Sequence, residues 1–159
     1  MDSPQFPAIH FRIPTIRVTK QFRFEMAHAL TGHDGPCRNI HGHSYCLSVT
    51  ISGKPSEDPK DPKNGMVMDF ADLKKIVAKE VVEQFDHVLV LNNSDKNLIS
   101  ITRADQKIIY FPFAPTCEML LAEFHHRIST KLPTHIRLFS IRLDETATSF
   151  AEWYADDNL

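Results

Sequence analysis

The sequence predicts an α+β domain in which two helices cover one face of an antiparallel sheet, in the order β-β-α-α-β-β. Two patterns carry this prediction. Apolar and polar residues alternate in four segments, which is typical of half-buried strands. In two other segments apolar residues recur at three- and four-residue spacing, which is typical of amphipathic helices. The length of 159 residues suits one domain with its own core.

The first two predicted strands are antiparallel neighbours joined by a turn-rich stretch at residues 31–36. In residues 16–28 the apolar side chains share one parity, at Ile16, Val18, Phe22, Phe24 and Met26. The second alternation places four apolar residues on one face, at Tyr45, Leu47, Val49 and Ile51. Each strand therefore presents one face to the core. Residues 53–65, with three prolines, are expected to form a polar loop.

Two helices follow. Asp69 offers an N-cap to the first, whose apolar stripe consists of Phe70, Leu73, Ile76, Val77, Val81 and Phe85. The second begins at Pro115-Thr116 and ends before Pro133, with a stripe of Leu120, Leu121, Phe124 and Ile128. The segment between them, residues 92–113, is long and mixed, with a short extended piece at 108–111.

The last two predicted strands form a hairpin, from 136–144 and 148–154, around a turn at Glu145-Thr146. We expect residues 15–159 to form the single domain. Residues 1–14 contain three prolines and no apolar run, so a loose N-terminal arm is expected there rather than a signal peptide.

Composition disfavours several classes of protein. Eighteen Lys and Arg stand against twenty Asp and Glu, which is not the basic excess expected of a nucleic-acid-binding protein. The sequence contains no stretch of eighteen apolar residues, the length that a helix needs to span a bilayer. Three cysteines without a CxxC motif suit a reducing compartment, so a cytoplasmic location is expected. From the charge balance and the lack of an apolar span, we expect no nucleic-acid or membrane partner.

Three histidines share the inward parity of the first two strands. His28 ends the first strand, and His41 and His43 begin the second. Alternate strand residues lie roughly 6.6 Å apart on one face, so paired strands would bring the three imidazoles together. Three neutral imidazoles and an open position are the ligand set of catalytic zinc. The alternative is that they are ordinary polar residues at a strand end.

Three further residues or pairs are candidates for chemistry. Cys37 precedes His41 in the loop, where a nearby dication would lower the thiol pKa and suit it to act as a base or nucleophile; a fourth ligand or an inert thiol are the alternatives. Asp86 can orient His87 for proton transfer, unless the pair is a plain surface pair. Glu145 places a carboxylate at the rim of the buried face, where ligand N–H groups could pair with it, unless it belongs to an exposed turn.

The chain resembles the family of 6-pyruvoyl- and 6-carboxy-tetrahydropterin synthases from about Thr19 to Glu152. The resemblance lies in the order of six motifs: Phe24-Glu25-Met26-Ala27-His28; Cys37-Arg38-Asn39-Ile40-His41-Gly42-His43-Ser44-Tyr45; Gly65-Met66-Val67-Met68-Asp69-Phe70; Phe85-Asp86-His87 with Leu91-Asn92; Pro115-Thr116-Cys117-Glu118; and Glu145-Thr146.

This resemblance implies a tunnelling fold, in which trimeric twelve-stranded barrels stack as a homohexamer with active sites between subunits. Ring closure would pair the two open edges of a four-stranded sheet. The resemblance also implies that zinc is held by His28, His41 and His43; that the base is Cys37; and that protons are relayed by Asp86 and His87. The pterin would be bound by Glu145 with Thr116 beside it, and Glu118 matches the same motif.

The substrate implied is 7,8-dihydroneopterin triphosphate. Three residues separate Cys37 from His41, and Asp69-Phe70 directly follows Met68. Both features resemble the 6-carboxy branch of the family, which belongs to queuosine biosynthesis. That branch forms 6-carboxy-5,6,7,8-tetrahydropterin and releases triphosphate and acetaldehyde. The alternatives are the 6-pyruvoyl product, a non-catalytic zinc- or pterin-binding homologue, and a zinc hydrolase. The segment 92–113 is longer than the family's usual connection.

Overall fold

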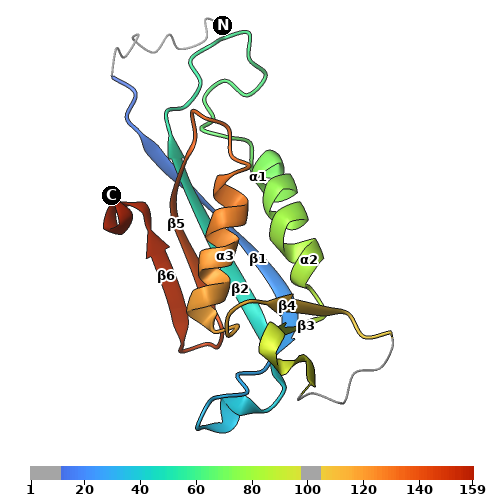
Figure 1. Ribbon diagram of the computed structural model, residues 1–159. Helices are drawn as coiled ribbons and strands as arrows, with labels where there is room; N and C mark the ends of the chain where they lie inside the picture. The colour runs from blue at the N-terminus through green and yellow to red at the C-terminus, as the bar shows by residue number, and fades with distance from the viewer. Residues whose placement is uncertain (1–11, 98–104) are drawn as a thin grey trace, which may run out of the picture.

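The computed structural model describes residues 12–97 and 105–159. A curled six-stranded sheet carries two helical segments on one face (Figure 1). The strands are β1 (Ile16–His28), β2 (His41–Gly53), β3 (Val88–Asn92), β4 (Ile108–Phe111), β5 (Arg137–Asp144) and β6 (Phe150–Tyr154). Most of the predicted arm, residues 1–11, lies outside the described residues. No helix in the described ranges is long and apolar enough to cross a membrane.

The four predicted strands are confirmed as β1, β2, β5 and β6. β1 and β2 pair antiparallel over their whole length, from Ile16 opposite Gly53 to His28 opposite His41. β2 pairs antiparallel with β5, and β5 with β6. Alternation on β1 holds as predicted from Phe22 onward, whereas Ile16 at the strand's start is 40% exposed.

Two strands lie outside the predicted order: β3 was not predicted, and β4 was predicted only as a short extended piece. β3 and β4 run parallel to each other, and β3 runs parallel to β1, so the sheet order is β4-β3-β1-β2-β5-β6. β3 begins with four consecutive buried residues, Val88, Leu89, Val90 and Leu91. A strand buried on both faces has no alternation to reveal it. The extended piece predicted at 108–111 is β4; residues 98–104 of the same connection lie outside the described part of the chain.

The first predicted helix is confirmed but is not uniform. It comprises α1 (Phe70–Val77), a π-helical turn η2 (Ala78–Val82) and α2 (Glu83–Phe85). The Asp69 side chain caps α1 by accepting from the backbone N–H of Ala71 at 2.7 Å. Phe70 was expected in the buried stripe, but it is 49% exposed. It is the first residue of the helix, and its ring lies 5.6 Å from the Lys20 ammonium rather than in the core.

The second predicted helix is α3 (Cys117–Ser129), capped by Thr116. Its buried residues are those predicted: Leu120, Leu121, Phe124 and Ile128. The Phe124 ring packs edge-on against Phe85 at 4.9 Å and Phe24 at 6.0 Å, joining both helical segments to β1. In Figure 1, α3 and the α1–α2 segment lie side by side over the long β1–β2 ribbon.

Short 3-10 turns complete the described chain: η1 (Pro36–Arg38), η3 (Asn93–Asn97) and η4 (Ala155–Asn158). The loop with η1 joins the end of β1 to the start of β2. The pairing of β2 with β5 stops at Cys46 opposite Asp144, so the first residues of β2 extend past the end of β5. Functional side chains gather at this end of the sheet.

Candidate metal centre and active site

Strand register brings the three predicted histidines together. His28 lies opposite His41 in the β1–β2 pair, and His43 lies two residues further along β2 on the same face. The ring centroids are 4.5 Å apart for His28 and His41, 5.2 Å for His28 and His43, and 5.0 Å for His41 and His43. One ligand nitrogen from each ring lies within 4.8 Å of the others. This arrangement can hold a metal ion.

Backbone carbonyls fix two of the rings. The Nδ1 atom of His28 lies 2.8 Å from the carbonyl oxygen of Pro115, and that of His41 lies 2.8 Å from the carbonyl oxygen of Asn39. Because a carbonyl oxygen only accepts hydrogen bonds, each Nδ1 carries the proton and each Nε2 presents its lone pair. Such outer hydrogen bonds typically orient metal-ligating histidines.

Two Nε2 atoms show that a metal fits this cluster. Those of His28 and His43 are buried and have no hydrogen-bond partner among the described residues. A buried polar atom without a partner costs about 1–3 kcal/mol, which coordination would offset. The pKa values of both imidazoles are lowered, chiefly by burial, with the neighbouring His41 contributing. Burial thus favours the neutral form that binds metal.

Glu145 lies beside the three histidines, directly after β5. Its Oε1 atom is 3.6 Å from His28 Nε2 and 3.8 Å from His43 Nε2, and its side chain is 24% exposed. The buried Tyr45 hydroxyl donates to the same oxygen at 3.3 Å. Burial and the Glu145 charge raise the Tyr45 pKa, so this hydroxyl stays protonated as a donor. The predicted rim position of Glu145 is confirmed.

The three cysteines lie in different surroundings. Cys37 is half-buried in η1, and its carbonyl accepts from the Leu30 N–H at 3.0 Å. Among the described residues, the candidate metal ligands that lie together are the three histidines, and the Cys37 thiol is not one of them. Cys46 is buried and Cys117 packs against the core, as predicted. Burial and the charge of Glu145 raise the pKa of Cys117 to about 12, which makes its thiol a poor nucleophile.

Asp86 and His87 form a fixed pair between α2 and β3. Asp86 Oδ1 accepts from the Glu25 N–H at 2.9 Å and lies 3.0 Å from His87 Nδ1. The His87 N–H donates to the Glu25 carbonyl at 2.6 Å, and His87 has φ 57°, a left-handed conformation that costs a non-glycine residue energy. Its side chain is 77% exposed. Among the described residues, no hydrogen bond or ion pair joins this pair to the three histidines within one chain.

Thr116 and Glu118 lie at the start of α3. The Thr116 hydroxyl accepts from the Met119 N–H at 3.3 Å, next to the Pro115 carbonyl that fixes His28. Thr116 also lines a cavity of about 510 Å³ beside the β1–β2 loop. Glu118 is exposed in the first turn of α3. Of the two, Thr116 is therefore the one that the structure places next to a ligand of the histidine cluster.

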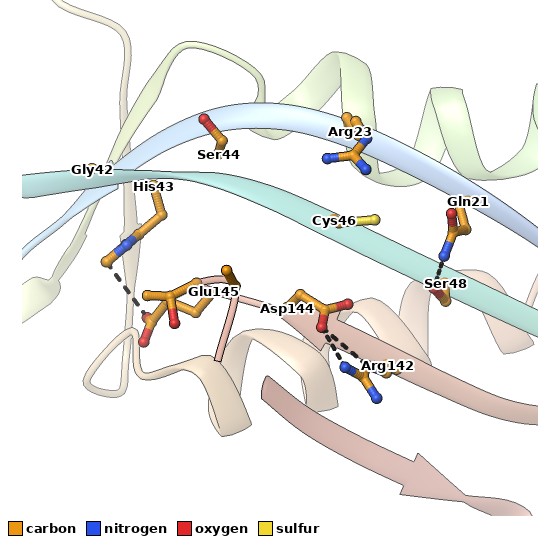
Figure 2. Close-up of a pocket in the computed structure, with 12 residues that line it drawn as sticks. Gln21, Arg23, Gly42, His43, Ser44, Cys46, Ser48, Arg142, Asp144 and Glu145 are labelled. Atoms are coloured by element: carbon orange, nitrogen blue, oxygen red, sulfur yellow. Dashed lines mark hydrogen bonds and ion pairs between the residues drawn. The ribbon is translucent and has the colours of Figure 1, made fainter. Parts of the chain in front are cut away.

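A larger hollow of about 870 Å³ opens where β2 leaves β5. Figure 2 shows His43 and Glu145 at one end of it and Arg23 and Gln21 at the other. Sequence reasoning missed Arg23 and Gln21 as pocket residues. It also missed the Tyr45 hydroxyl and the buried carboxylate of Asp95, which lines the smaller cavity. Glu145, the partner of Tyr45, lies 100 positions away, and Thr31, one partner of Asp95, lies 64 positions away, so no local pattern pointed to these contacts.

Fold and site together define an α+β protein with a cluster of three histidines at the end of a curled sheet that could hold a metal ion. The family model for 6-pyruvoyl tetrahydropterin synthase matches residues 17–156. The chain belongs to this family, and the resemblance drawn from the motifs is confirmed.

Two curated relatives carry a more specific name. The chain is 38% identical over 141 residues to the 6-carboxy-5,6,7,8-tetrahydropterin synthase of Haemophilus influenzae, covering 86% of this chain and 97% of the relative. It is 33% identical over 141 residues to the enzyme of the same name from Rickettsia bellii, covering 86% of this chain and 99% of the relative.

Solved structures share the fold. A protein of Wolinella succinogenes superposes with a TM-score of 0.71 at 18% identity, covering 89% of this chain and 99% of the other. The 6-pyruvoyl tetrahydropterin synthase of Caenorhabditis elegans superposes with a TM-score of 0.64 at 24% identity, covering 91% of this chain and 99% of the synthase. The predicted tunnelling-fold subunit is thereby confirmed.

Proposed function

We propose that this protein converts 7,8-dihydroneopterin triphosphate to 6-carboxy-5,6,7,8-tetrahydropterin with release of triphosphate and acetaldehyde, as a zinc-dependent step of queuosine biosynthesis. The names of the curated relatives support the product. The observation that carries the proposal is the cluster itself: buried Nε2 atoms of His28 and His43 without partners, beside the carboxylate of Glu145.

Zinc would be held by His28, His41 and His43. The choice of metal rests on the donor set, because three neutral imidazoles suit zinc. When bound, zinc supplies a Lewis acid that makes a neighbouring carbon acid of the substrate side chain easier to deprotonate.

The chain's own residues would divide binding from proton transfer. Glu145 would accept hydrogen bonds from the 2-amino and ring N–H groups of the pterin, with its carboxylate already oriented by Tyr45. Thr116 and Glu118 would contribute to the substrate side of the site. Cys37 would take and return protons at carbon, and Asp86 would hold His87 for proton transfer at oxygen.

We also propose a homohexamer built as a dimer of trimers. In the described part of one chain, β4 and β6 are the outer strands of the sheet, and open edges invite pairing with another chain. An active site shared between subunits would also explain why, among the described residues, no hydrogen bond or ion pair joins Asp86 or His87 to the histidine cluster of the same chain. Sedimentation of dilute protein tests this proposal, and an active monomer would contradict it.

Product analysis tests the activity. Wild-type protein incubated with dihydroneopterin triphosphate should release one acetaldehyde per triphosphate, whereas Cys37→Ala should release neither at a comparable rate. The second candidate is the 6-pyruvoyl product, favoured by the description of the matching family and by the likeness to the C. elegans synthase fold. Triphosphate release without acetaldehyde would select that candidate and reject the first.

A further inference from the structure

A buried carboxylate lies outside the proposed chemistry. Asp95, in η3 just after β3, is 2% exposed. Its Oδ1 atom accepts from the Thr31 hydroxyl at 2.5 Å and from the Ser94 hydroxyl at 3.3 Å, and its Oδ2 atom accepts from the Asn92 N–H at 3.3 Å. A buried carboxylate is retained only with such donors. Ser94 lies in the same turn, Asn92 is the last residue of β3, and Thr31 comes from the loop between β1 and β2.

That loop carries Cys37 between two strands that carry the histidine cluster. The Leu30 N–H donates to the Cys37 carbonyl at 3.0 Å, which ties the start of the loop to η1. Thr31 is the next residue after Leu30. Within the described residues, the Thr31–Asp95 hydrogen bond is the side-chain hydrogen bond that joins the loop to a segment outside the β1–β2 hairpin.

β3 supports the same end of the loop by apolar contact. Ala29, the first loop residue, is 1% exposed and packs with Leu89 and Leu91. The strand that presents these two leucines leads directly into the turn that presents Asp95. The packing of Ala29 and the side-chain hydrogen bond of Thr31 are therefore set by β3 and η3.

We propose that Asp95 is a positioning residue for catalysis, which acts through Thr31 and Leu30 to hold the Cys37 turn in place relative to the three histidines. This inference rests on the proposed function of Cys37. Proton transfer requires a close approach of the base to its carbon, and a displacement of about 1 Å can cost on the order of 100-fold in rate. Thr31, Asp95 and Thr116 line the same cavity of about 510 Å³, so releasing the bond would free that wall of the cavity.

The test removes the hydrogen bond and keeps the shape of the side chain. Thr31→Val replaces the hydroxyl by a methyl group, and Thr31→Ser is the conservative variant that restores the donor. The matched control is Ser56→Ala, which removes another hydroxyl-to-carboxylate bond, from Ser56 to Asp61 at 2.9 Å, in the polar loop after β2.

Kinetics give the first readout. Thr31→Val should lower kcat by a factor on the order of 10 with KM within about twofold, because the substrate's contacts are kept while the base is misplaced. Thr31→Ser and Ser56→Ala should stay close to wild type. In a Cys37→Ala background the Thr31→Val effect should vanish, whereas a general structural defect would lower the residual activity further. An unchanged kcat, or an equal loss in that background, would overturn the proposal.

Hydrogen exchange gives a readout that does not depend on turnover. The Leu30 amide should exchange on the order of tenfold faster in Thr31→Val and in Asp95→Asn than in wild type or Ser56→Ala, because its bond to Cys37 opens more often. Unchanged Leu30 exchange would overturn the proposal. Absence of acetaldehyde or triphosphate release from wild-type protein would instead reject the proposed function, while the exchange comparison would still decide whether Asp95 holds the loop.

Discussion

The Tyr45 hydroxyl donates a hydrogen bond to Glu145 Oε1 across 3.3 Å, between residues 100 positions apart in the chain. The Tyr45 ring is fully buried, and its centroid lies 5.5 Å from that of His43 and 6.2 Å from that of His28. One side chain thus packs against the histidine cluster and orients the carboxylate proposed to bind the pterin. The candidate metal cluster and the carboxylate proposed to bind the pterin therefore share a single buried support.

Tyr45→Phe should raise KM about three- to tenfold and leave kcat within about twofold. The variant keeps the ring and removes one hydrogen bond to a charged group, which contributes about 1 kcal/mol or somewhat more. Steady-state kinetics with dihydroneopterin triphosphate measure this. Tyr154→Phe is the matched control, because its hydroxyl bonds Glu152 on β6, outside the cluster. A fall in kcat with an unchanged KM would show that Tyr45 does not act through substrate binding.

His28→Ala should lose most of the bound zinc. His28 is 2% exposed and its Nε2 atom has no hydrogen-bond partner within the described residues, so it is the most enclosed of the three candidate ligands. Metal analysis of purified protein checks this, with His126→Ala on the exposed face of α3 as control. Full zinc retention would remove His28 from the ligand set.

Removal of the metal should leave the domain folded. The core joins β1, β2 and β5 to both helical segments through buried residues such as Leu47, Phe85 and Phe124, and none of these depends on the cluster. Chelated protein should therefore keep its far-ultraviolet circular dichroism spectrum and a cooperative thermal transition, unlike a zinc finger. Loss of the cooperative transition on chelation would contradict this expectation.

Glu145→Gln and Cys37→Ala should affect different kinetic constants. The carboxylate of Glu145 would bind the pterin equally in the ground and transition states, so its loss should mainly raise KM. The thiol of Cys37 would transfer protons, so its loss should lower kcat by a factor on the order of 100 or more while zinc stays bound. If Cys37→Ala empties the metal site, the thiol is a ligand and the proposed proton transfer is wrong.

Local signals account for what the sequence could predict. Period-two alternation identified β1 and β2 and gave the parity that brings His28, His41 and His43 together. The N-cap at Asp69 located the start of the first helix, and Pro115-Thr116 located the start of the second. These signals lie within a few residues of one another, so they can be recognised without knowledge of the fold.

What the sequence did not reveal depends on distant parts of the chain. β3 is buried along most of its length, so it lacks alternation, and its parallel pairing with β1 has no local signature. The burial of Asp95 could not be predicted without β3, because η3 follows that strand and brings Asp95 to Thr31, 64 positions earlier in the chain. The π-helical turn η2 likewise follows no residue signal that we recognise.

The Asp86 carboxylate should make stability depend on pH. Donation from the Glu25 N–H, together with the neighbouring His87, holds the pKa of Asp86 below its usual value of 3.8. A carboxyl group with a lowered folded-state pKa stabilises the fold above the unfolded value, and this contribution is lost as pH falls through the folded value. The side chain is 40% exposed, so solvent screening limits the effect to at most about 1 kcal/mol.

Asp86→Asn should therefore be less stable than wild type at pH 7, and the difference should shrink as pH falls below 3.8, toward the lower folded-state pKa. Urea unfolding at pH 7 and pH 3 measures this, with chelator present in every sample so that metal loss in acid affects both proteins equally. Asp157→Asn, at an exposed carboxylate of η4, controls for the removal of one negative charge. A difference between wild type and Asp86→Asn that is as large at pH 3 as at pH 7 would mean that the asparagine acts by altered packing, because the contribution of a charge-dependent hydrogen bond must already have begun to fall below the unfolded pKa of 3.8.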